Sequence, residues 1–184
     1  MITVHEVEQG SDEWQELRAG KYTGSNAHKL LRHGAGTYAL TEQNGFGGNF
    51  WTKRGHLLET EAVELYERIA RVSVDRPGFV TNDRYPRCGY SPDGLVLERA
   101  LLEVKCFDEP KHLKLIAGDI SLEILAQVHF GMLICERKIA YLLPYNPKLE
   151  PRKAFKIIPI KFNRAIANNF KRILSAKEVQ IGKI

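Results

Sequence analysis

The sequence has few cysteines and no long apolar run, and each shortage excludes a class of protein. Cys88, Cys106 and Cys135 are odd in number, widely spaced and form no CxxC pair, so neither a disulfide framework nor a zinc or iron–sulfur site is expected. No apolar stretch approaches the roughly 20 residues that cross a bilayer. Residues 1–6 lack the basic and apolar segments of a signal peptide. We therefore expect an intracellular, cytoplasmic protein with no membrane partner.

The charge of the chain is unevenly distributed along its length. Its 184 residues suffice for a hydrophobic core and are expected to form one domain, 1–184, with a net charge of +5. Residues 138–184 contain eleven Lys and Arg residues against two acids, whereas the remainder has 16 basic and 20 acidic residues. A basic third beside an acidic remainder favours a polyanion-binding surface next to a cation-binding pocket. A solvated surface of mixed charge explains the basic third about as well.

Hydrophobic spacing and turn residues predict an α/β domain, with a central mixed β-sheet flanked by helices. Ser11 is expected to cap a helix that ends near Gly20, and Ser25 to cap a second helix over 26–32. Further helices are predicted over 51–69, 120–135 and 162–177. Strands are predicted over 72–81, 88–90, 95–98, 101–107, 139–145 and 154–160. Leu122, Leu125, Val128, Met132 and Leu133 should form the buried stripe of the helix at 120–135. Residues 33–50, rich in Gly, Thr and Asn, are expected to form an irregular, mobile loop.

The most informative motif is a carboxylate on a turn, followed ten residues later by an acid-x-lysine triplet. It extends from Ser91-Pro92-Asp93-Gly94 to Glu103-Val104-Lys105. Pro-Asp-Gly is typical of a turn, so Asp93 is expected at the head of a hairpin, folded back beside Glu103. In a strand Glu103 and Lys105 point to the same face. Two carboxylates and an amine on one surface are what a hydrolase needs to hold Mg²⁺ and activate water against a phosphodiester.

A magnesium site could be made from very few of these groups. Mg²⁺ prefers oxygen ligands and keeps several waters, so Asp93, Glu103 and the carbonyl of Val104 would suffice. Lys105 would orient the attacking water or stabilise charge on the phosphate, and a lysine near a metal and partly buried should have a lowered pKa that suits a base. An E-x-K triplet also occurs by chance in surface strands as a solvated ion pair. The preceding turn and the apolar flanks make the catalytic interpretation as strong as that alternative.

Further motifs occur in one order along the chain and make a family resemblance specific. The sequence resembles the phage lambda exonuclease family, the YqaJ-type viral recombinase nucleases, within the PD-(D/E)XK superfamily. The matching motifs are Glu8-Gln9-Gly10-Ser11-Asp12-Glu13-Trp14, Leu17-Arg18-Ala19-Gly20, Thr23-Gly24-Ser25, Gly55-His56-Leu57-Leu58-Glu59, Asp83, Ser91-Pro92-Asp93-Gly94, Leu102-Glu103-Val104-Lys105, Ala126-Gln127-Val128 and Tyr145-Asn146-Pro147. An Asn-Asp turn between strands explains Asp83 equally well. The resemblance covers most of the chain and implies a restriction-endonuclease-like core at about 51–160.

The resemblance implies roles for the site residues. Asp93, Glu103 and the Val104 carbonyl would bind Mg²⁺, for which Mn²⁺ would substitute, with two ions per site. Lys105 would serve catalysis. Glu59 would reach the site through water or a second metal, and Gln127 would lie near the scissile phosphate. Without the resemblance, Glu59 would be a solvated helix acid and Gln127 a structural hydrogen-bonding residue.

The N-terminal helices, 11–32, match a pocket for a terminal 5′-phosphate. Arg18 and Ser25 match its binding residues, and Thr23 could add a hydroxyl. The physics agrees, because free N–H groups at a helix start favour an anion and arginine offers a bidentate fork. The alternative is that Ser25 is only a helix cap. Trp14 is expected to be a core residue rather than a base-stacking one.

The resemblance also implies an activity and an assembly. A Mg²⁺-dependent 5′-to-3′ exonuclease would act on double-stranded DNA ends and leave 3′ overhangs for a single-strand annealing protein in phage-type recombination. It would be a ring-shaped homotrimer from a phage or prophage in a bacterial cell, with the basic C-terminal third tracking the DNA backbone. The chain is shorter than the lambda enzyme, chiefly around 33–50 and at the C-terminus, and the missing pieces could be trimer contacts. The ring is therefore a weaker expectation than the catalytic chemistry. In addition, Cys106-Phe107 follows the lysine, where family members can have a proline. The alternatives are a structure-specific or restriction-like endonuclease on the same fold, or a non-catalytic DNA-binding recombination subunit, against which the intact Asp93, Glu103 and Lys105 argue.

Overall fold

The computed structural model of the protein describes residues 1–36, 40 and 50–181. Most of the loop predicted over 33–50 lies outside these described residues. The helices are α1 (Asp12–Arg18), the 3-10 turn η1 (Gly24–Asn26), α2 (Ala27–His33), α3 (Phe50–Ala70), α4 (Glu109–Ile116), α5 (Leu122–Ile134), α6 (Pro151–Ala154) and α7 (Arg164–Ile181). The strands are β1 (Ile2–His5), β2 (Phe79–Asn82), β3 (Gly89–Tyr90), β4 (Gly94–Val96), β5 (Ala100–Lys105), β6 (Ile139–Pro144) and β7 (Ile158–Lys161).

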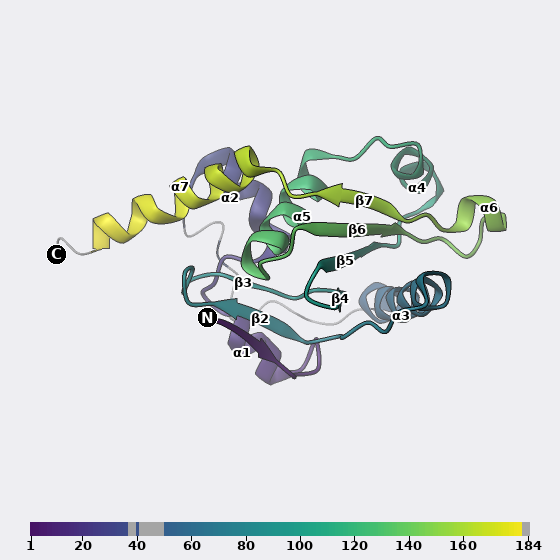
Figure 1. The fold of residues 1–184 in the computed structure, drawn as a ribbon, viewed down its shortest axis with the longest axis horizontal. Coiled ribbons are helices and arrows are strands. Elements are labelled where there is room, and N and C mark those ends of the chain that lie inside the picture. Colours follow the sequence, from purple (N-terminus) through teal and green to yellow (C-terminus); the bar gives the residue numbers. More distant parts are fainter. Residues whose placement is uncertain (37–39, 41–49, 182–184) are drawn as a thin grey trace.

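The strands form two small sheets rather than the one central sheet expected (Figure 1). One sheet has the order β1-β2-β3, with antiparallel neighbours. The other has the order β4-β5-β6-β7 and is mixed, because β5 and β6 are parallel while the outer pairs are antiparallel. The break falls at Ser91-Pro92-Asp93, where proline has no N–H to donate to a ladder. The predicted α/β class with flanking helices is confirmed.

Helices cover both faces of the four-stranded sheet. The alternation of side chains along β5 separates the two layers. Leu102 and Val104 pack in one cluster with Ala62 and Val63 of α3. Leu101 packs in the other cluster, which includes residues of α2, α5 and α7. In Figure 1, α7 extends beyond the rest of the molecule toward the C-terminus.

The first helix and its cap are as predicted. The second helix is present, but the residue predicted to cap it does not do so. Ser11 caps α1, accepting a hydrogen bond from the backbone N–H of Trp14 at 3.2 Å, and Trp14 is buried. Ser25 caps no helix: the chain first makes the turn η1, so Ser25 already lies inside it and is exposed. Its hydroxyl instead pairs with that of Thr23 at 3.1 Å.

Several other element boundaries differ from the expectation. Only the end of the strand predicted over 72–81 forms β2, since Pro77 and Gly78 interrupt the preceding segment. The strand predicted over 154–160 begins later, because α6 occupies Pro151–Ala154. Strand β1 and helix α4 were not predicted. Leu122 is 83% exposed because it is the first residue of α5, whereas Val128 and Met132 are fully buried. Among the described residues, no helix is both long and apolar enough to cross a bilayer.

Candidate catalytic site

The hairpin of β4 and β5 brings the predicted carboxylates together, although not by the expected turn. Gly94 pairs with Leu102, so continuing the antiparallel register places Asp93 beside Glu103. The hairpin turn lies at 97–99, with Leu97 at a φ of +50°, and not at Pro92-Asp93-Gly94. Asp93 therefore stands at the entry to β4 rather than at the head of the hairpin. The predicted proximity holds because the register fixes it.

Glu103 is buried and surrounded by hydrogen-bond donors. Its Oε1 accepts from Lys105 Nζ at 2.6 Å and from Gln127 Nε2 at 2.6 Å. Lys105 Nζ also donates to Gln127 Oε1 at 3.0 Å, which closes a triangle. The hydroxyl of Tyr90 donates to Glu103 Oε2 in a short hydrogen bond. The structure thus joins three predicted residues, and it adds Tyr90.

The backbone of Val104 faces Asp93. Asp93 Oδ2 accepts a hydrogen bond from the Val104 N–H at 2.6 Å. The carbonyl of Lys105 is directed to the opposite neighbour, where it accepts from the N–H of Tyr145 after β6. Because successive residues of a strand direct their backbone groups to opposite sides, the Val104 carbonyl lies on the Asp93 side. This is the side on which a cation shared with Asp93 would need it.

Burial and neighbouring acids disfavour the charged form of Asp93. Desolvation raises its pKa well above the usual value, and the charges of Glu103 and Glu59 raise it further, while Lys105 and the Val104 N–H lower it. Glu59, on α3, lines a hollow of about 420 Å³ together with Asp93, Pro92 and Gln9. Asp93 is therefore close enough to feel the charges of acids from two other segments, Glu103 on β5 and Glu59 on α3.

The charge state of Lys105 differs from the expectation. Burial lowers its pKa, but the surrounding carboxylates, Glu103 foremost, outweigh burial and raise the pKa above its usual value. The expected lowered pKa is thus wrong for the arrangement with no metal, because three acids face this amine. Lys105 is a protonated donor here. Burial first, and then the charges of Glu59 and Asp93, raise the pKa of Cys106, next in sequence, to about 12, so its thiol is protonated at neutral pH.

These residues fit a magnesium ion. The described residues contain no group of three or more His, Cys, Asp or Glu side chains placed as a metal cage. Mg²⁺ does not need one, because it takes few protein oxygens and keeps several waters. Asp93, Glu103 and the Val104 carbonyl would hold it, with Glu59 close enough to raise the pKa of Asp93. Burial first, and then the charges of Glu103 and Glu59, raise the pKa of Asp93, and a bound cation would favour its charged form instead.

Arg18 lies against the segment that leads into Asp93. Its guanidinium donates to Ser91 Oγ at 3.0 Å and stacks on the ring of Trp14 at 4.1 Å. Burial lowers the pKa of Arg18 to about 10, so it stays charged at neutral pH. The indole N–H of Trp14 donates to Ser91 Oγ at 2.9 Å and to the Gly78 carbonyl at 3.1 Å. Trp14 is thus a core residue that supports Arg18, as expected.

The Thr23-Gly24-Ser25 segment approaches the same site from the other side. A Cβ on Gly24 would lie 2.4 Å from Tyr90 Cε2 and 3.4 Å from Gln127 Cγ. The turn η1 therefore packs directly on two residues that contact Glu103. Arg18 thus bonds Ser91, and Gly24 packs on the preceding residue, Tyr90, whereas Ser25 is exposed and bonds only the Thr23 hydroxyl.

Tyr90 was missed as a site residue, the motif that contains Ser91 gave that residue no role, and one match, Asp83, falls outside the site. Tyr90 and Ser91 directly precede Pro92-Asp93, and a tyrosine in a strand next to a buried acid was the available signal. Asp83 is exposed in the turn after β2, where its carboxylate pairs with the N-terminal amine at 3.1 Å. The Asn-Asp turn therefore accounts for Asp83.

The mixed sheet, the flanking helices and the acid–acid–lysine cluster define an α/β fold of the PD-(D/E)XK-like class. Residues 13–138 match the family described as the YqaJ-like viral recombinase domain. The chain belongs to this family, as its motifs predicted. None of the curated proteins matches the chain.

Solved structures share the fold. LHK-Exo, an alkaline exonuclease from Laribacter hongkongensis, is similar with a TM-score of 0.77 and 22% identity over 94% of this chain and 93% of that one. LHK-Exo in complex with dAMP is similar with a TM-score of 0.78 and the same identity and coverage. A phage related exonuclease from Haemophilus somnus 129PT has a TM-score of 0.56 and 16% identity, over 88% of this chain and 93% of that one.

Proposed function

We propose that the protein is a Mg²⁺-dependent exodeoxyribonuclease that degrades one strand of duplex DNA from a 5′-phosphorylated end. The observation that carries this is the partly buried cluster of Asp93, Glu103 and Lys105, in which Lys105 Nζ bonds Glu103 at 2.6 Å and the backbone of Val104 faces Asp93. Membership of the recombinase family and the names of the similar structures, which are exonucleases, support DNA as the substrate. The dAMP bound by LHK-Exo is consistent with a mononucleotide product.

The chain's own residues have distinct tasks in this reaction. Asp93, Glu103 and the Val104 carbonyl would hold one ion, and Glu59 a second one or its water; Mn²⁺ would substitute. The bound metal would polarise the phosphate, activate the attacking water and stabilise the leaving oxygen. Lys105, kept protonated by its acidic neighbours, would orient that water and stabilise negative charge rather than abstract a proton. Gln127 holds Lys105 in place at 3.0 Å.

The direction of attack would be decided by the N-terminal residues. Arg18 is anchored on Trp14 and Ser91, which leaves part of its guanidinium fork for a terminal 5′-phosphate. Ser25 and Thr23 would add hydroxyls from η1. Removing nucleotides from that end leaves a 3′ overhang, which would pass to a single-strand annealing protein in phage-type recombination. A ring-shaped trimer in the cytoplasm of a bacterial host completes the proposal.

The decisive experiment incubates the protein with Mg²⁺ and end-labelled linear duplexes that carry either a 5′-phosphate or a 5′-hydroxyl. We expect mononucleotides from the phosphorylated end and at least tenfold slower release from the hydroxyl end. Lys105→Ala should lower the rate by a factor of about 100 or more, as loss of a charge-stabilising donor does. Full activity of that variant would refute the assignment. Cleavage of a covalently closed circle would favour the endonuclease alternative, and metal-independent binding without cleavage in Mg²⁺ or Mn²⁺ the non-catalytic one.

A further inference from the structure

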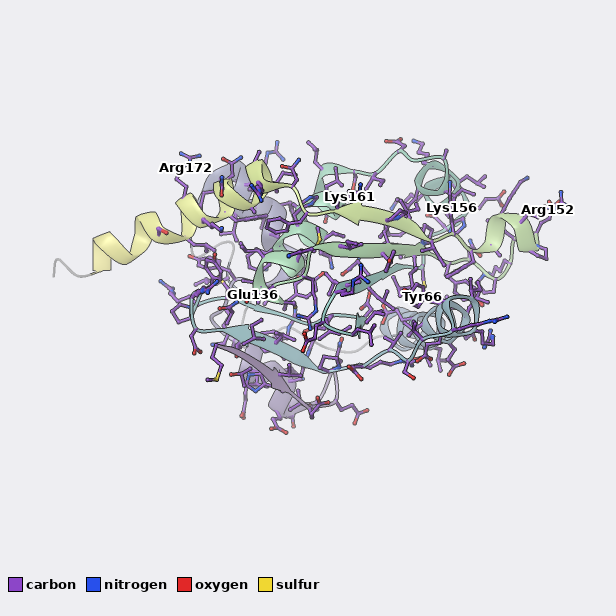
Figure 2. The ribbon with its side chains drawn as sticks, viewed as in Figure 1. Tyr66, Glu136, Arg152, Lys156, Lys161 and Arg172 are labelled. Carbon is purple, nitrogen blue, oxygen red and sulfur yellow. The ribbon has the colours of Figure 1, made fainter. Side chains whose placement is uncertain are left out.

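A second cavity, of about 520 Å³, lies at the other end of the four-stranded sheet from the catalytic cluster. Ile139 lines it and pairs with Ala100, whereas Lys105 is at the opposite end of β5. At about 3.3 Å per residue, the two ends of β5 are roughly 16 Å apart. Glu136 and Lys161, both labelled in Figure 2, mark two sides of this cavity. We call it the basic cavity, and it is distinct from the catalytic site.

The charge of the basic cavity is strongly positive. Six of its lining residues are cations: Arg84, Arg137, Lys138, Lys161, Arg164 and Lys171. Glu136 is the one acid among the described lining residues. Its Oε1 accepts from Asn82 Nδ2 at 3.2 Å and from Arg84 Nη1 at 3.2 Å, so its charge is already compensated. The remaining cations would attract a polyanion.

One of these cations is held in position with an unused donor. Arg137 Nη1 donates to the Cys135 carbonyl at 2.8 Å, which fixes the guanidinium. Its Nε is buried and has no acceptor among the described residues. The fixed guanidinium therefore holds its positive charge at the wall of the cavity, where it would attract a phosphate group.

The cavity also has an apolar side. Tyr85 and Phe162 contribute aromatic rings, and Met132 and Leu133 of α5 contribute aliphatic surface. Cations that follow a backbone, combined with aromatic rings on which bases stack, characterise sites for single-stranded nucleic acid. A duplex keeps its bases stacked inside, and would leave this apolar side unused.

We propose that the basic cavity binds single-stranded DNA, with phosphates on the cations and bases against Tyr85 and Phe162. A nuclease that removes one strand of a duplex generates such a ligand at every step. Identifying the ligand as the protein's own product rests on the proposed function, whereas the binding site itself does not. Holding the surviving strand at the end of β5 opposite to the catalytic cluster would keep it away from cleavage.

The test measures binding of a fluorescent 12-nucleotide strand with a 5′-hydroxyl by anisotropy, in EDTA so that no cleavage occurs. The variant combines Lys138→Glu, Arg164→Glu and Lys171→Glu, three exposed positions that should tolerate the change. The matched control combines Arg68→Glu, Lys111→Glu and Lys114→Glu, three exposed positions outside the basic C-terminal third, which alter the net charge equally.

We expect the cavity variant to bind at least tenfold more weakly. The slope of log affinity against log salt concentration should become shallower by about 2, because each of three lost phosphate contacts contributes about 0.7. The control should change affinity less than about twofold, and both should melt as the wild type does in circular dichroism. An abasic strand should bind the wild type several-fold more weakly than a normal strand, because stacking is lost. Equal loss in the control would overturn the site. The proposal would also be overturned if the abasic strand bound as tightly as the normal strand and polyglutamate displaced it. That result would indicate that the cavity binds an acidic protein segment instead.

This test is independent of the cleavage experiment. Binding is measured without metal, so a protein that fails to cleave DNA can still show the predicted loss. Conversely, an active nuclease whose strand binding is unchanged by the cavity variant refutes the basic cavity alone.

Discussion

Each oxygen of Glu103 already accepts a hydrogen bond from a protein donor. Lys105 and Gln127 occupy Oε1, and Tyr90 donates to Oε2. A carboxylate oxygen has two lone pairs, so Oε2 can keep the bond from Tyr90 and still bind a cation. Groups that orient a metal ligand in this way commonly change metal affinity by about 10–100-fold when they are lost. At the proposed metal site, Tyr90 would thus position Glu103 for the ion.

Removing the Tyr90 hydroxyl should weaken metal binding. We expect Tyr90→Phe to lower Mg²⁺ affinity by about tenfold, as measured by isothermal titration calorimetry, because Glu103 loses its orientation. The control is Tyr66→Phe, a buried tyrosine in the cluster of α3 on the other face of the sheet. Unchanged Mg²⁺ affinity in Tyr90→Phe, with Tyr66→Phe also unchanged, would mean that Lys105 and Gln127 alone orient Glu103.

The raised pKa of Asp93 predicts a cost in stability. Between its ordinary value of 3.8 and the higher folded value, the unfolded chain has lost this proton while the folded protein still holds it. The free energy of unfolding without metal should therefore fall as pH rises through this window. Asp93→Asn removes the cost and keeps an acceptor for the Val104 N–H. We expect a higher melting temperature in EDTA at neutral pH, no further rise with Mg²⁺ and no activity.

Calorimetry in EDTA at several pH values separates this effect from a packing effect. The gain from Asp93→Asn should grow from about pH 4 toward neutral pH and vanish in acid. A gain that is independent of pH would contradict the ionisation of Asp93 as its cause. Asp119→Asn, at a position exposed in the loop before α5, should show little change at any pH and serves as the control.

Sequence reasoning succeeded at residue scale where a local rule decides the outcome. Alternation in a strand places Glu103 and Lys105 on one face, and the structure agrees, with both bonded to Gln127. The raised pKa of Lys105 was beyond such a rule, because it depends on acids from three segments. Tyr90 was missed for the same reason: its partner is thirteen residues away, across the break between the two sheets.

At the scale of elements, two glycines make a slot for the Tyr90 ring. A Cβ on Gly131 of α5 would lie 2.4 Å from Tyr90 Cζ, and one on Gly24 of η1 would lie 2.4 Å from Tyr90 Cε2. Both positions must therefore lack a side chain if the ring is to reach Glu103. The slot couples the segment proposed to bind a 5′-phosphate to the proposed metal site, since η1 and α5 both contact Tyr90.

Filling this slot should damage both functions together. Gly24→Ala is expected to destabilise the protein by about 1–3 kcal/mol through overpacking, and to lower both Mg²⁺ affinity and the preference for a 5′-phosphate. Chemical denaturation and the paired duplex substrates provide the measurements. Gly55→Ala is the stability control, because its Cβ would meet only Glu59 Oε1 at 3.9 Å within α3. That helical change should add about 0.5–1 kcal/mol. Loss of phosphate preference without loss of Mg²⁺ affinity would separate the two sites.

The helices and strands show why the ends of an element were harder to predict than the side of it that is buried. The sequence predicted five helices, at 11–20, 26–32, 51–69, 120–135 and 162–177, from capping residues and apolar spacing, and each is present. The Pro-Asp-Gly signature was misplaced as the hairpin head because it is equally compatible with a strand entry after a break. Ser25 was wrongly predicted to cap a helix because a 3-10 turn and a helix cap share the same residue preferences. In both cases, contacts with distant parts of the chain decide which local structure forms.

For the whole molecule, the separation of charge bears on assembly. The catalytic site gathers acids at one end of β5, whereas the basic cavity lies at the other end. A single protomer that holds DNA mainly through exposed cations should release it readily as salt rises. A ring that encloses the duplex would instead retain its substrate through many cleavage steps. Processivity at raised salt therefore distinguishes the proposed trimer from a monomer.

We expect light scattering to give about three times the protomer mass of 20.9 kDa. Degradation of a long duplex, started by Mg²⁺ after a heparin trap is added, should continue past the first hundred or so nucleotides because the topological link outlasts each ionic contact. Raising the salt after initiation should change the number of nucleotides removed per binding event much less than it changes the initial association. A monomeric mass with release after a few nucleotides would contradict the ring. Such a result would leave the chemistry of Asp93, Glu103 and Lys105 intact, because that cluster is complete within one chain.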